Sequence, residues 1–582
     1  MKYIAYAWGK GNDGVLFFVQ RLEEMLFHYS DDIVKTPIHN TATLIEEYII
    51  LERDKNVKSF HLNMISDELI RSLQNDIIAK NRIGSKRIEG IINEIRINPN
   101  DTIHYLHGLI TTSDYMKWCS NYLIEKLNKE NAKEEITKGL RGWISAIIQS
   151  GYSPEYIYRY LKNEFDKEEI ADPYNVCIDF LQHFNKENNE YRVYFRFYAI
   201  MKSYQSLLIE RLEVSFDDDN WFDQLNNKKN KSFVGYVDIK AIDPYVAMEQ
   251  AFNALNIFIK FYRVISNHKK AIVSNSGMVR RISDDVCMYL PVKSRGYKAI
   301  EVEPKMDLKS MIDSVVLGCQ RKGANTYSHV NKAINLHNMA LSQLDLNDGF
   351  VNLWSILEVV SSDSKEESKI KSVVDSVLPI LQNDFFFKYF ISLCDDIKTA
   401  LNRTDYQNLL KCILHGDSPQ YKIACLIFLE EYEDLREELF ELLELYPNIR
   451  NRIFKLYKLR KDKKEVFKIA SMYGERVKWH LYRLYRVRND IVHAGKSTKN
   501  IALLGEHLHI YCDSIIDEIL VKLAYRDGIH TIKDVFVDTK LLLIAKAKAF
   551  DENMPMKEDD IRIILMKYFD EVNDSCYGNM NS

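Results

Sequence analysis

The segment YRVRNDIVHAGK, residues 485–496, ends a helix that we predict over residues 478–494. Apolar side chains recur along this helix at three- and four-residue spacing, which predicts one buried face. They are Leu481, Leu484, Tyr485, Ile491 and Val492. Arg488 falls on the same apolar seam, where an unpaired guanidinium group would lose its hydration at a large cost in free energy. We therefore expect Arg488 to meet a carboxylate, to line a cleft, or to face the same helix of a second subunit.

The polar residues beside Arg488 form a short pattern at the helix end. Asn489 and His493 are four residues apart, so they share one helix face. Arg488 and His493 are five residues apart, which is about 140° around an α-helix, so only the long reach of arginine could bring both groups to one phosphate. Gly495 is a natural left-handed cap. The helix dipole favours a protonated His493 in the last turn, which suits a group that exchanges a proton near neutral pH.

A second line of side chains on this helix is suited to RNA binding. Its members are spaced by four, three and four residues, and they are Trp479, Arg483, Arg486 and Asp490. Their positive charges and aromatic ring can contact phosphates and bases, and Lys496 adds a cation directly after the helix.

The charge of the surrounding chain is sharply partitioned. Residues 448–500 contain 16 Lys and Arg against 4 Asp and Glu, whereas residues 430–446 contain eight acidic residues and one arginine. Two solvated helices of opposite charge would explain this partition. A locally basic surface is also what a phosphate backbone requires of its partner.

The remainder of the chain predicts a mainly α protein with an α+β amino-terminal half. Helical periodicity dominates up to about residue 185, and Ser153-Pro154 starts one of these helices. Alternating segments at 191–198, 211–216 and 232–240 predict strands, and Asp243-Pro244 caps a long helix. From 326 onward all segments have helical periodicity. We predict an amino-terminal region at 1–325 with a boundary near 185, an all-α domain at 326–535, and a helical tail at 536–582.

Composition limits the class of protein. The 582 residues are too many for one core, and 46% apolar with 28% charged residues is typical of a soluble globular chain. The net charge of −4 identifies no partner. No run approaches the roughly 18 apolar residues of a membrane span, and the first residues lack the features of a signal peptide. We expect a cytoplasmic protein with no membrane contact.

Metal-ligand patterns are absent from the sequence. None of the nine cysteines forms a C-x-x-C pair. His329 and His337 have no carboxylate or cysteine at metal-ligand spacing, and His507 and His509 lie on different helix faces, so we expect structural roles for them. We therefore predict no metal site and no cofactor.

A glycine-rich segment offers a competing site. Gly9, Gly11 and Gly14 form a G-x-G-x-x-G pattern between strand-like and helix-like segments, which is the context of a phosphate-binding loop. The following hundred residues have helical periodicity, so a plain glycine turn is the main alternative. The chain has no G-x-x-x-x-G-K-[ST] pattern, which excludes a P-loop NTPase.

Two segments resemble a known family. RNDIVH, residues 488–493, is similar to the R-[polar]-x-x-x-H motif of HEPN-domain ribonucleases. FVNLWSILEVV, residues 350–360, resembles the first core helix of the Apea-like HEPN group, with Trp354 and Glu358 in its W-x-x-x-E setting. The resemblance covers about residues 330–535 of the carboxy-terminal half.

The resemblance implies a helical bundle that dimerises, so that two motifs form one composite RNA-cutting cleft. It implies a metal-independent endoribonuclease in which the ribose 2′-OH attacks the adjacent phosphorus and leaves a 2′,3′-cyclic phosphate. His493 would act as general acid or base, Arg488 would hold the phosphate, and Asn489 would orient either group. Glu358 would support the site directly or fix the motif helix, and Asp490 would support it as a neighbour.

The resemblance also points to a bacterial toxin or anti-phage abortive-infection effector. Its partners would be RNA of unknown class and a second copy, with a phage-derived or nucleotide trigger at the amino-terminal half. The alternatives are a non-catalytic HEPN adaptor for dimerisation or RNA binding, and nucleotide binding at the glycine loop.

Overall fold

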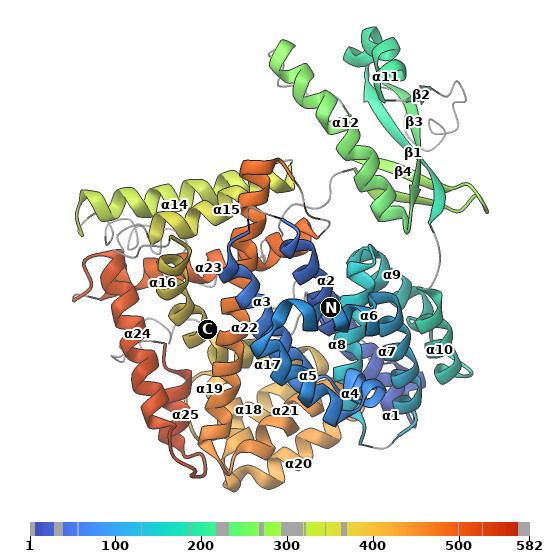
Figure 1. The fold of residues 1–582 in the computed structure, drawn as a ribbon. Helices are drawn as coiled ribbons and strands as arrows, with labels where there is room; N and C mark the ends of the chain where they lie inside the picture. Colours follow the sequence, from blue (N-terminus) through green and yellow to red (C-terminus); the bar gives the residue numbers. More distant parts are fainter. Residues whose placement is uncertain are drawn as a thin grey trace. The chain divides into compact units, whose positions relative to one another are not determined.

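The computed structural model describes residues 6–567, apart from 28–38, 55–56, 130, 185–187, 213, 217–231, 267–272, 293–317, 319, 321, 344, 362–368, 497, 499 and 527. Helices dominate, and one five-stranded antiparallel sheet lies within residues 189–291 (Figure 1). The carboxy-terminal region is all helical, so the predicted fold class is confirmed. Among the described residues, no helix is long and apolar enough to cross a membrane.

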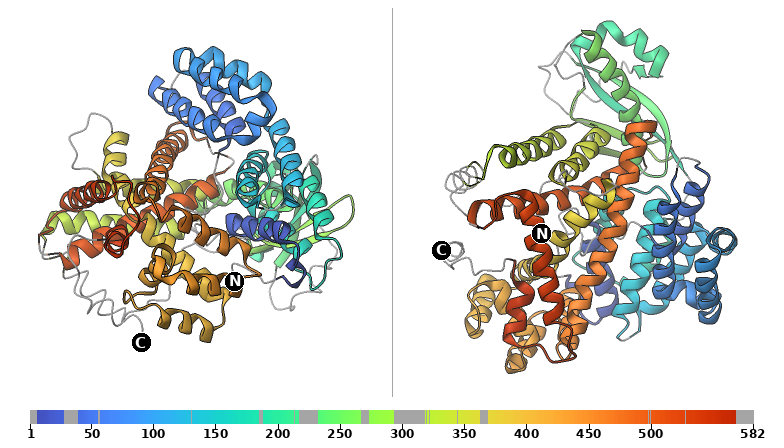
Figure 2. Two further views of the ribbon diagram at one scale, coloured as in Figure 1. Left: turned by 90° about the horizontal axis from the view of Figure 1, so that it is seen from below. Right: turned by 60° about the vertical axis from the view of Figure 1, so that its left-hand side comes forward.

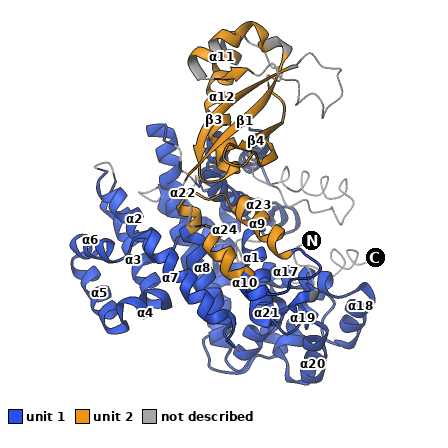
Figure 3. Ribbon diagram, turned by 90° about the vertical axis from the view of Figure 1, so that its right-hand side faces the viewer, with its two compact units in different colours: residues 1–146, 166–175, 297–582 blue, residues 147–165, 176–296 orange. Residues whose placement is uncertain are grey.

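The chain forms two compact units that are each discontinuous in sequence (Figure 3). Unit 1 contains residues 1–146, 166–175 and 297–582, and unit 2 contains 147–165 and 176–296. The boundary predicted near 185 falls on residues 185–187, outside the described residues. The boundary predicted at 325 lies inside helix α14 (Ala324–Ser342). The one at 535 lies inside α24 (Ile532–Ala549), because a capping box of Thr531 and Asp534 starts that helix earlier.

The amino-terminal part of the chain is a series of short helices. They are α1 (Asp13–Leu26), α2 (Thr41–Glu52), α3 (Ser59–Asn75), α4 (Ile77–Ile83), α5 (Ser85–Ile97), α6 (Pro99–Leu109), α7 (Thr112–Leu127) and α8 (Lys133–Gln149). Asn40 begins α2 with a reciprocal capping box to Thr43, which satisfies backbone donors that a helix start leaves free.

Unit 2 contains the sheet and the long helix that packs on it. Its strands are β1 (Asn189–Tyr198), β2 (Ser215–Phe216), β3 (Ser232–Ala241), β4 (Ser276–Arg281) and β5 (Cys287–Pro291), in the order β2-β3-β1-β4-β5. Further elements in this part of the chain are α9 (Pro154–Phe165), α10 (Pro173–His183), the 3₁₀ helix η2 (Ala199–Tyr204), α11 (Gln205–Leu212) and α12 (Pro244–Ser266).

Period-two patterning sets the buried face of β1. Tyr191, Val193, Phe195 and Phe197 alternate along the strand and are buried in one cluster with residues of α12. These four side chains are therefore core residues. The Asp243 carboxylate accepts hydrogen bonds from the backbone N–H groups of Tyr245 and Val246, which confirms the predicted cap of α12.

The carboxy-terminal helices of unit 1 share one large apolar core. They are α14, α15 (Leu346–Val360), α16 (Lys369–Asn383), α17 (Phe385–Ala400), α18 (Arg403–Cys412), α19 (Pro419–Phe428), α20 (Glu433–Leu442), α21 (Pro447–Leu459), α22 (Lys463–Asn489), α23 (Ile501–Tyr525), α24 and α25 (Glu558–Leu565).

Helix α22, which carries the sequence motif, lies at the centre of these contacts. It packs against α15, α16, α21 and the amino-terminal α3 (Figure 1, Figure 2). Asp462 caps its first turn by accepting a hydrogen bond from the Lys464 N–H. A Cβ atom at Gly474 would lie 2.7 Å from the Gln382 side chain, so glycine allows the close approach of α16 at this point.

Candidate functional site

Arg488 meets a carboxylate, which is one of the three environments that its place on the seam predicted. Its Nη2 donates to Glu358 Oε2 on α15 at 3.2 Å, and its Nη1 donates to Asn489 Oδ1 at 3.0 Å. The Arg488 side chain is 20% exposed. Its Nε is buried and has no hydrogen-bond partner among the described residues. The guanidinium is thus fixed on one side while part of it stays open to solvent.

Glu358 is itself held in place from its own helix. The indole Nε1 of Trp354 donates to Glu358 Oε1 at 3.0 Å, four residues away on α15. The buried Trp354 ring lies against Tyr485, with centroids 5.6 Å apart. Trp354, Glu358 and Arg488 therefore form a chain of contacts that joins the two segments in which the family resemblance was found.

The helix changes its geometry between Arg488 and His493. Residues Asp490–Ala494 form a π-helical turn that ends at Gly495, whose φ of 62° and ψ of 18° give the predicted left-handed cap. In a π-turn the hydrogen bonds join residues five apart, so such residues lie closer to one face than the about 140° expected for an α-helix. Arg488 lies in α22 just before this turn, and His493 lies within it.

His493 is exposed and forms no hydrogen bond or ion pair with any described residue. Asn489, which the spacing placed beside His493, contacts Arg488 instead. Both observations leave the imidazole of His493 accessible to a ligand from outside.

Asp490 and Lys496 flank the π-turn. The backbone carbonyl of Asp490 accepts hydrogen bonds from the N–H groups of Gly495 and Lys496. Loss of hydration raises the pKa of the Asp490 carboxyl, Asp54 acts in the same direction, and Arg486 and Lys496 oppose them. The Lys496 side chain is exposed, while Trp479 is half-buried on α22.

Arg483 and Arg486, which we predicted to contact RNA, are buried inside unit 1. Arg483 donates to both oxygens of Glu47, at 2.8 to 3.3 Å, and to Glu68 at 2.7 Å. Arg486 also donates to Glu47. Both guanidinium groups are therefore engaged by carboxylates of α2 and α3 in the folded chain. Sequence spacing could not reveal these partners, because they lie more than 400 residues away.

Electrostatics at this ion-pair network follow from burial and charge. Burial would raise the pKa of Glu47, but Arg483, His39 and Arg486 outweigh it and hold that pKa far below its ordinary value. Burial raises the pKa of Glu68, although Arg483 donates a hydrogen bond to it and opposes this shift. Burial and Arg483 lower the pKa of His39 to about 3, although Glu47 opposes them.

Much of the basic block is neutralised in the same way. Arg452 pairs with Glu24 of α1, at 3.0 Å, and with Asp396 of α17. Lys463 lies near Asp560, at 3.6 Å, and Lys464 pairs with Asp551 at 2.8 Å. These pairs neutralise part of the excess of Lys and Arg over residues 448–500, and the pair of Lys464 with Asp551 lies at the surface.

The glycine-rich segment lacks the expected strand in its described part. Residues Ala7–Gly9 form a 3₁₀ turn before α1, and a Cβ at Gly14 would lie 2.1 Å from the carbonyl oxygen of Leu127. Asp13 stands in the first turn of α1 and pairs with Lys133 at 2.7 Å. Close packing accounts for Gly14, and the negative charge of Asp13 in the first turn disfavours a phosphate at this helix start.

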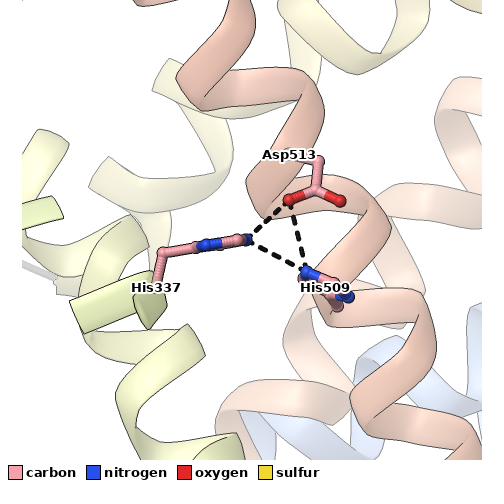
Figure 4. Close-up of side chains that lie close together, drawn as sticks. All are labelled: His337, His509 and Asp513. Atoms are coloured by element: carbon pink, nitrogen blue, oxygen red, sulfur yellow. Dashed lines mark hydrogen bonds and ion pairs between the residues drawn. The ribbon is translucent and has the colours of Figure 1, made fainter. Parts of the chain in front are cut away.

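Three side chains missed by the sequence reasoning converge elsewhere in unit 1. His337 of α14 lies against His509 and Asp513 of α23 (Figure 4). His337 therefore has a carboxylate partner, contrary to our expectation, because the partner comes from a helix 176 residues later. A pocket of about 290 Å³ lies beside α14 and α15, and Arg488, Asn489 and His493 do not line it.

The chain matches no protein-family model, no curated protein and no solved structure.

Proposed function

We propose that this chain is a metal-independent endoribonuclease of the HEPN type that acts as a homodimer. The observation that carries the proposal is Arg488, fixed by Glu358 and Asn489, one π-turn before an exposed His493. A cation can stabilise charge on a ribose phosphate and an imidazole can transfer a proton, so each copy of the chain would supply one group of each kind.

The reaction uses the RNA's own 2′-hydroxyl as nucleophile. His493 of one subunit takes the proton from O2′, the O2′–P bond forms, and the P–O5′ bond breaks. O5′ receives a proton from the second imidazole, which gives a 2′,3′-cyclic phosphate and a 5′-hydroxyl. Arg488 stabilises the negative charge that develops on the phosphoryl oxygens.

The need for two imidazoles makes the dimer part of the mechanism. Val492, directly before His493, is 47% exposed, and an exposed apolar side chain beside the motif fits a subunit interface. In such a dimer the two π-turns would face each other across one RNA strand.

The contacts of α2 and α3 with α22 support a regulatory role for the amino-terminal region. Glu47 and Glu68 hold the helix that ends in the motif, and Phe60 packs edge-on against Tyr482 at 5.1 Å. A phage-derived or nucleotide trigger that altered these helices would act directly on the position of α22. This arrangement suits a toxin or abortive-infection effector that is restrained until triggered.

The proposal is tested by RNA cleavage with the full-length protein in the presence of a chelator. His493→Ala and Arg488→Ala should each lower the cleavage rate by at least about 100-fold, the low end for loss of an acid–base group or a charge-stabilising donor. Exposed His530→Ala and Arg403→Ala are the matched controls and should cleave like the wild type. Equal thermal unfolding of all variants would show that the loss is chemical. A wild type that binds RNA but cuts none would favour the non-catalytic adaptor.

A further inference from the structure

Two imidazoles and one carboxylate converge on a single point between α14 and α23. His337 Nε2 lies 3.0 Å from His509 Nε2 and 2.7 Å from Asp513 Oδ1, and His509 Nε2 lies 3.4 Å from the same oxygen. Figure 4 shows the three side chains pointing toward one another from the two helices.

The helices place these groups with little freedom. His337 lies on the buried face of α14. That face has a residue every three or four positions, and its other members are Thr326, Val330, Ala333 and Ala340. On α23, His509 and Asp513 are four residues apart and share one face. Ligands at this spacing on one helix are a recurrent way of holding a metal ion.

The three side chains of the cluster differ in their exposure to solvent. The His509 side chain is 1% exposed, His337 is 19% exposed, and Asp513 is 44% exposed. An imidazole buried as deeply as His509 needs a partner for its nitrogen atoms. If His337 Nε2 carries a proton, that N–H group can donate to only one of the two neighbouring atoms. A metal ion, in contrast, would accept a lone pair from His337 Nε2, His509 Nε2 and Asp513 Oδ1 together.

Small movements of the side chains would give the distances of a metal site. With metal–ligand distances of about 2.0–2.1 Å, tetrahedral geometry separates two ligand atoms by about 3.3 Å. The observed separations of 3.4 and 3.0 Å are close to this value, and the 2.7 Å between His337 and Asp513 would widen when an ion binds. A cation at that distance from all three atoms would stand about 1 Å outside their plane, with room for a further ligand on its open side.

We propose that His337, His509 and Asp513 bind a divalent transition-metal ion, with water in the open coordination position. Two imidazoles, one carboxylate and an open position form a known ligand set for Zn²⁺, and Fe²⁺ accepts the same set. The exposed Asp513 gives the ion a path from solvent. Bound metal ties α14 to α23 and stabilises the helical bundle independently of any reaction at Arg488 and His493.

Metal binding is measured on the full-length protein, first stripped with a chelator and then dialysed against Zn²⁺. The wild type should bind about one Zn²⁺ per chain at this site, and Zn²⁺ should raise its unfolding temperature. His337→Ala and Asp513→Asn should weaken binding by at least about tenfold, since changes in outer-shell partners alone cost 10–100-fold.

His329→Ala, a histidine change on the same helix, is the matched control and should bind like the wild type. Asp513 is exposed, so Asp513→Asn should fold like the wild type. This variant therefore tests metal binding even if His337→Ala fails to fold. X-ray absorption of the Zn²⁺ form should give a nitrogen and oxygen shell with two imidazoles. Zn²⁺ binding and thermal stabilisation that are equal in the wild type, His337→Ala and Asp513→Asn would overturn the assignment, as would no binding by the wild type. All these readouts are independent of RNA cleavage.

Discussion

At the scale of single residues, Arg488 shows how a charged side chain can occupy the apolar seam of a helix. Glu358 and Asn489 satisfy its two terminal nitrogens, so burial of most of the guanidinium does not leave it unpaired. Trp354 in turn holds the carboxylate, which limits the positions that Arg488 can take. Glu358 is therefore a positioning residue for Arg488.

Replacing Glu358 with glutamine removes the negative charge of this side chain and keeps its size. The amide oxygen can still accept from Trp354, but the charge-assisted bond to Arg488 is lost, so we expect cleavage to fall about tenfold while substrate binding changes less. Single-turnover rates and RNA binding constants measure the two effects separately. Glu465→Gln, a change at the start of α22 where the glutamate pairs with Lys468, is the control; a similar loss there would argue against positioning by Glu358.

His39 makes stability depend on pH. Burial and Arg483 lower the pKa of His39 to about 3 in the folded protein, whereas the ordinary pKa of histidine in the unfolded chain is about 6.5. Protonation of His39 at about pH 6 therefore favours the unfolded state. The stabilisation is complete above about pH 6.5 and is lost as the pH falls toward 3. Between pH 7 and pH 5 this amounts to about 2 kcal/mol.

Thermal unfolding of His39→Gln across this pH range provides the measurement. The variant should lose less stability than the wild type between pH 7 and pH 5. Parallel curves for the two proteins would contradict a neutral, buried His39.

At the scale of elements, the ion pairs that join α2 and α3 to α22 are the main long-range feature. Glu47 binds two arginines that spacing alone had predicted to face RNA. Removing one partner of a buried pair leaves an uncompensated charge, so Glu47→Ala should destabilise the protein by about 3–5 kcal/mol.

A double-mutant cycle with Arg483→Met decides whether this contact is structural. If Arg483 serves packing, the double variant should be markedly more stable than the sum of the two single losses predicts. Additive losses would mean that Arg483 and Glu47 are not coupled, and would restore Arg483 as a candidate RNA contact.

Local sequence patterns predicted elements better than they predicted partners. The strand at 191–198, the Asp243 cap and the Gly495 cap follow from periodicity and from backbone preferences that act within a few residues. A carboxylate partner was one of three environments predicted for Arg488, and the resemblance had singled out Glu358 as a residue that could fix the motif helix, but the structure was needed to pair the two. The π-turn carries no composition signal that we recognised.

Partners from distant parts of the chain were missed for a common reason. Glu47 meets Arg483, and Asp513 meets His337, only because tertiary packing brings separate helices together. A buried arginine predicts that a carboxylate lies nearby, but the sequence does not identify which carboxylate it is. The position of His337 in the seam of α14 was a usable signal, since a polar residue at a core position needs a partner.

At the scale of the whole molecule, the proposed activity depends on two copies of the chain. Val492→Glu should place a charge at the expected interface and weaken dimerisation without unfolding the single chain, because Val492 is exposed there. Sedimentation equilibrium measures the effect. Val537→Glu, a change at another exposed valine on α24, is the control, and equal behaviour of the two variants would place the interface elsewhere.

The most direct test of the proposed reaction is the chemistry of the RNA ends that the full-length protein produces in chelator. We expect 2′,3′-cyclic phosphates and 5′-hydroxyls at every new end, and none of these products with His493→Ala. Products with 5′-phosphate ends, or unchanged cutting by His493→Ala, would contradict a 2′-hydroxyl attack assisted by the imidazole at the end of α22.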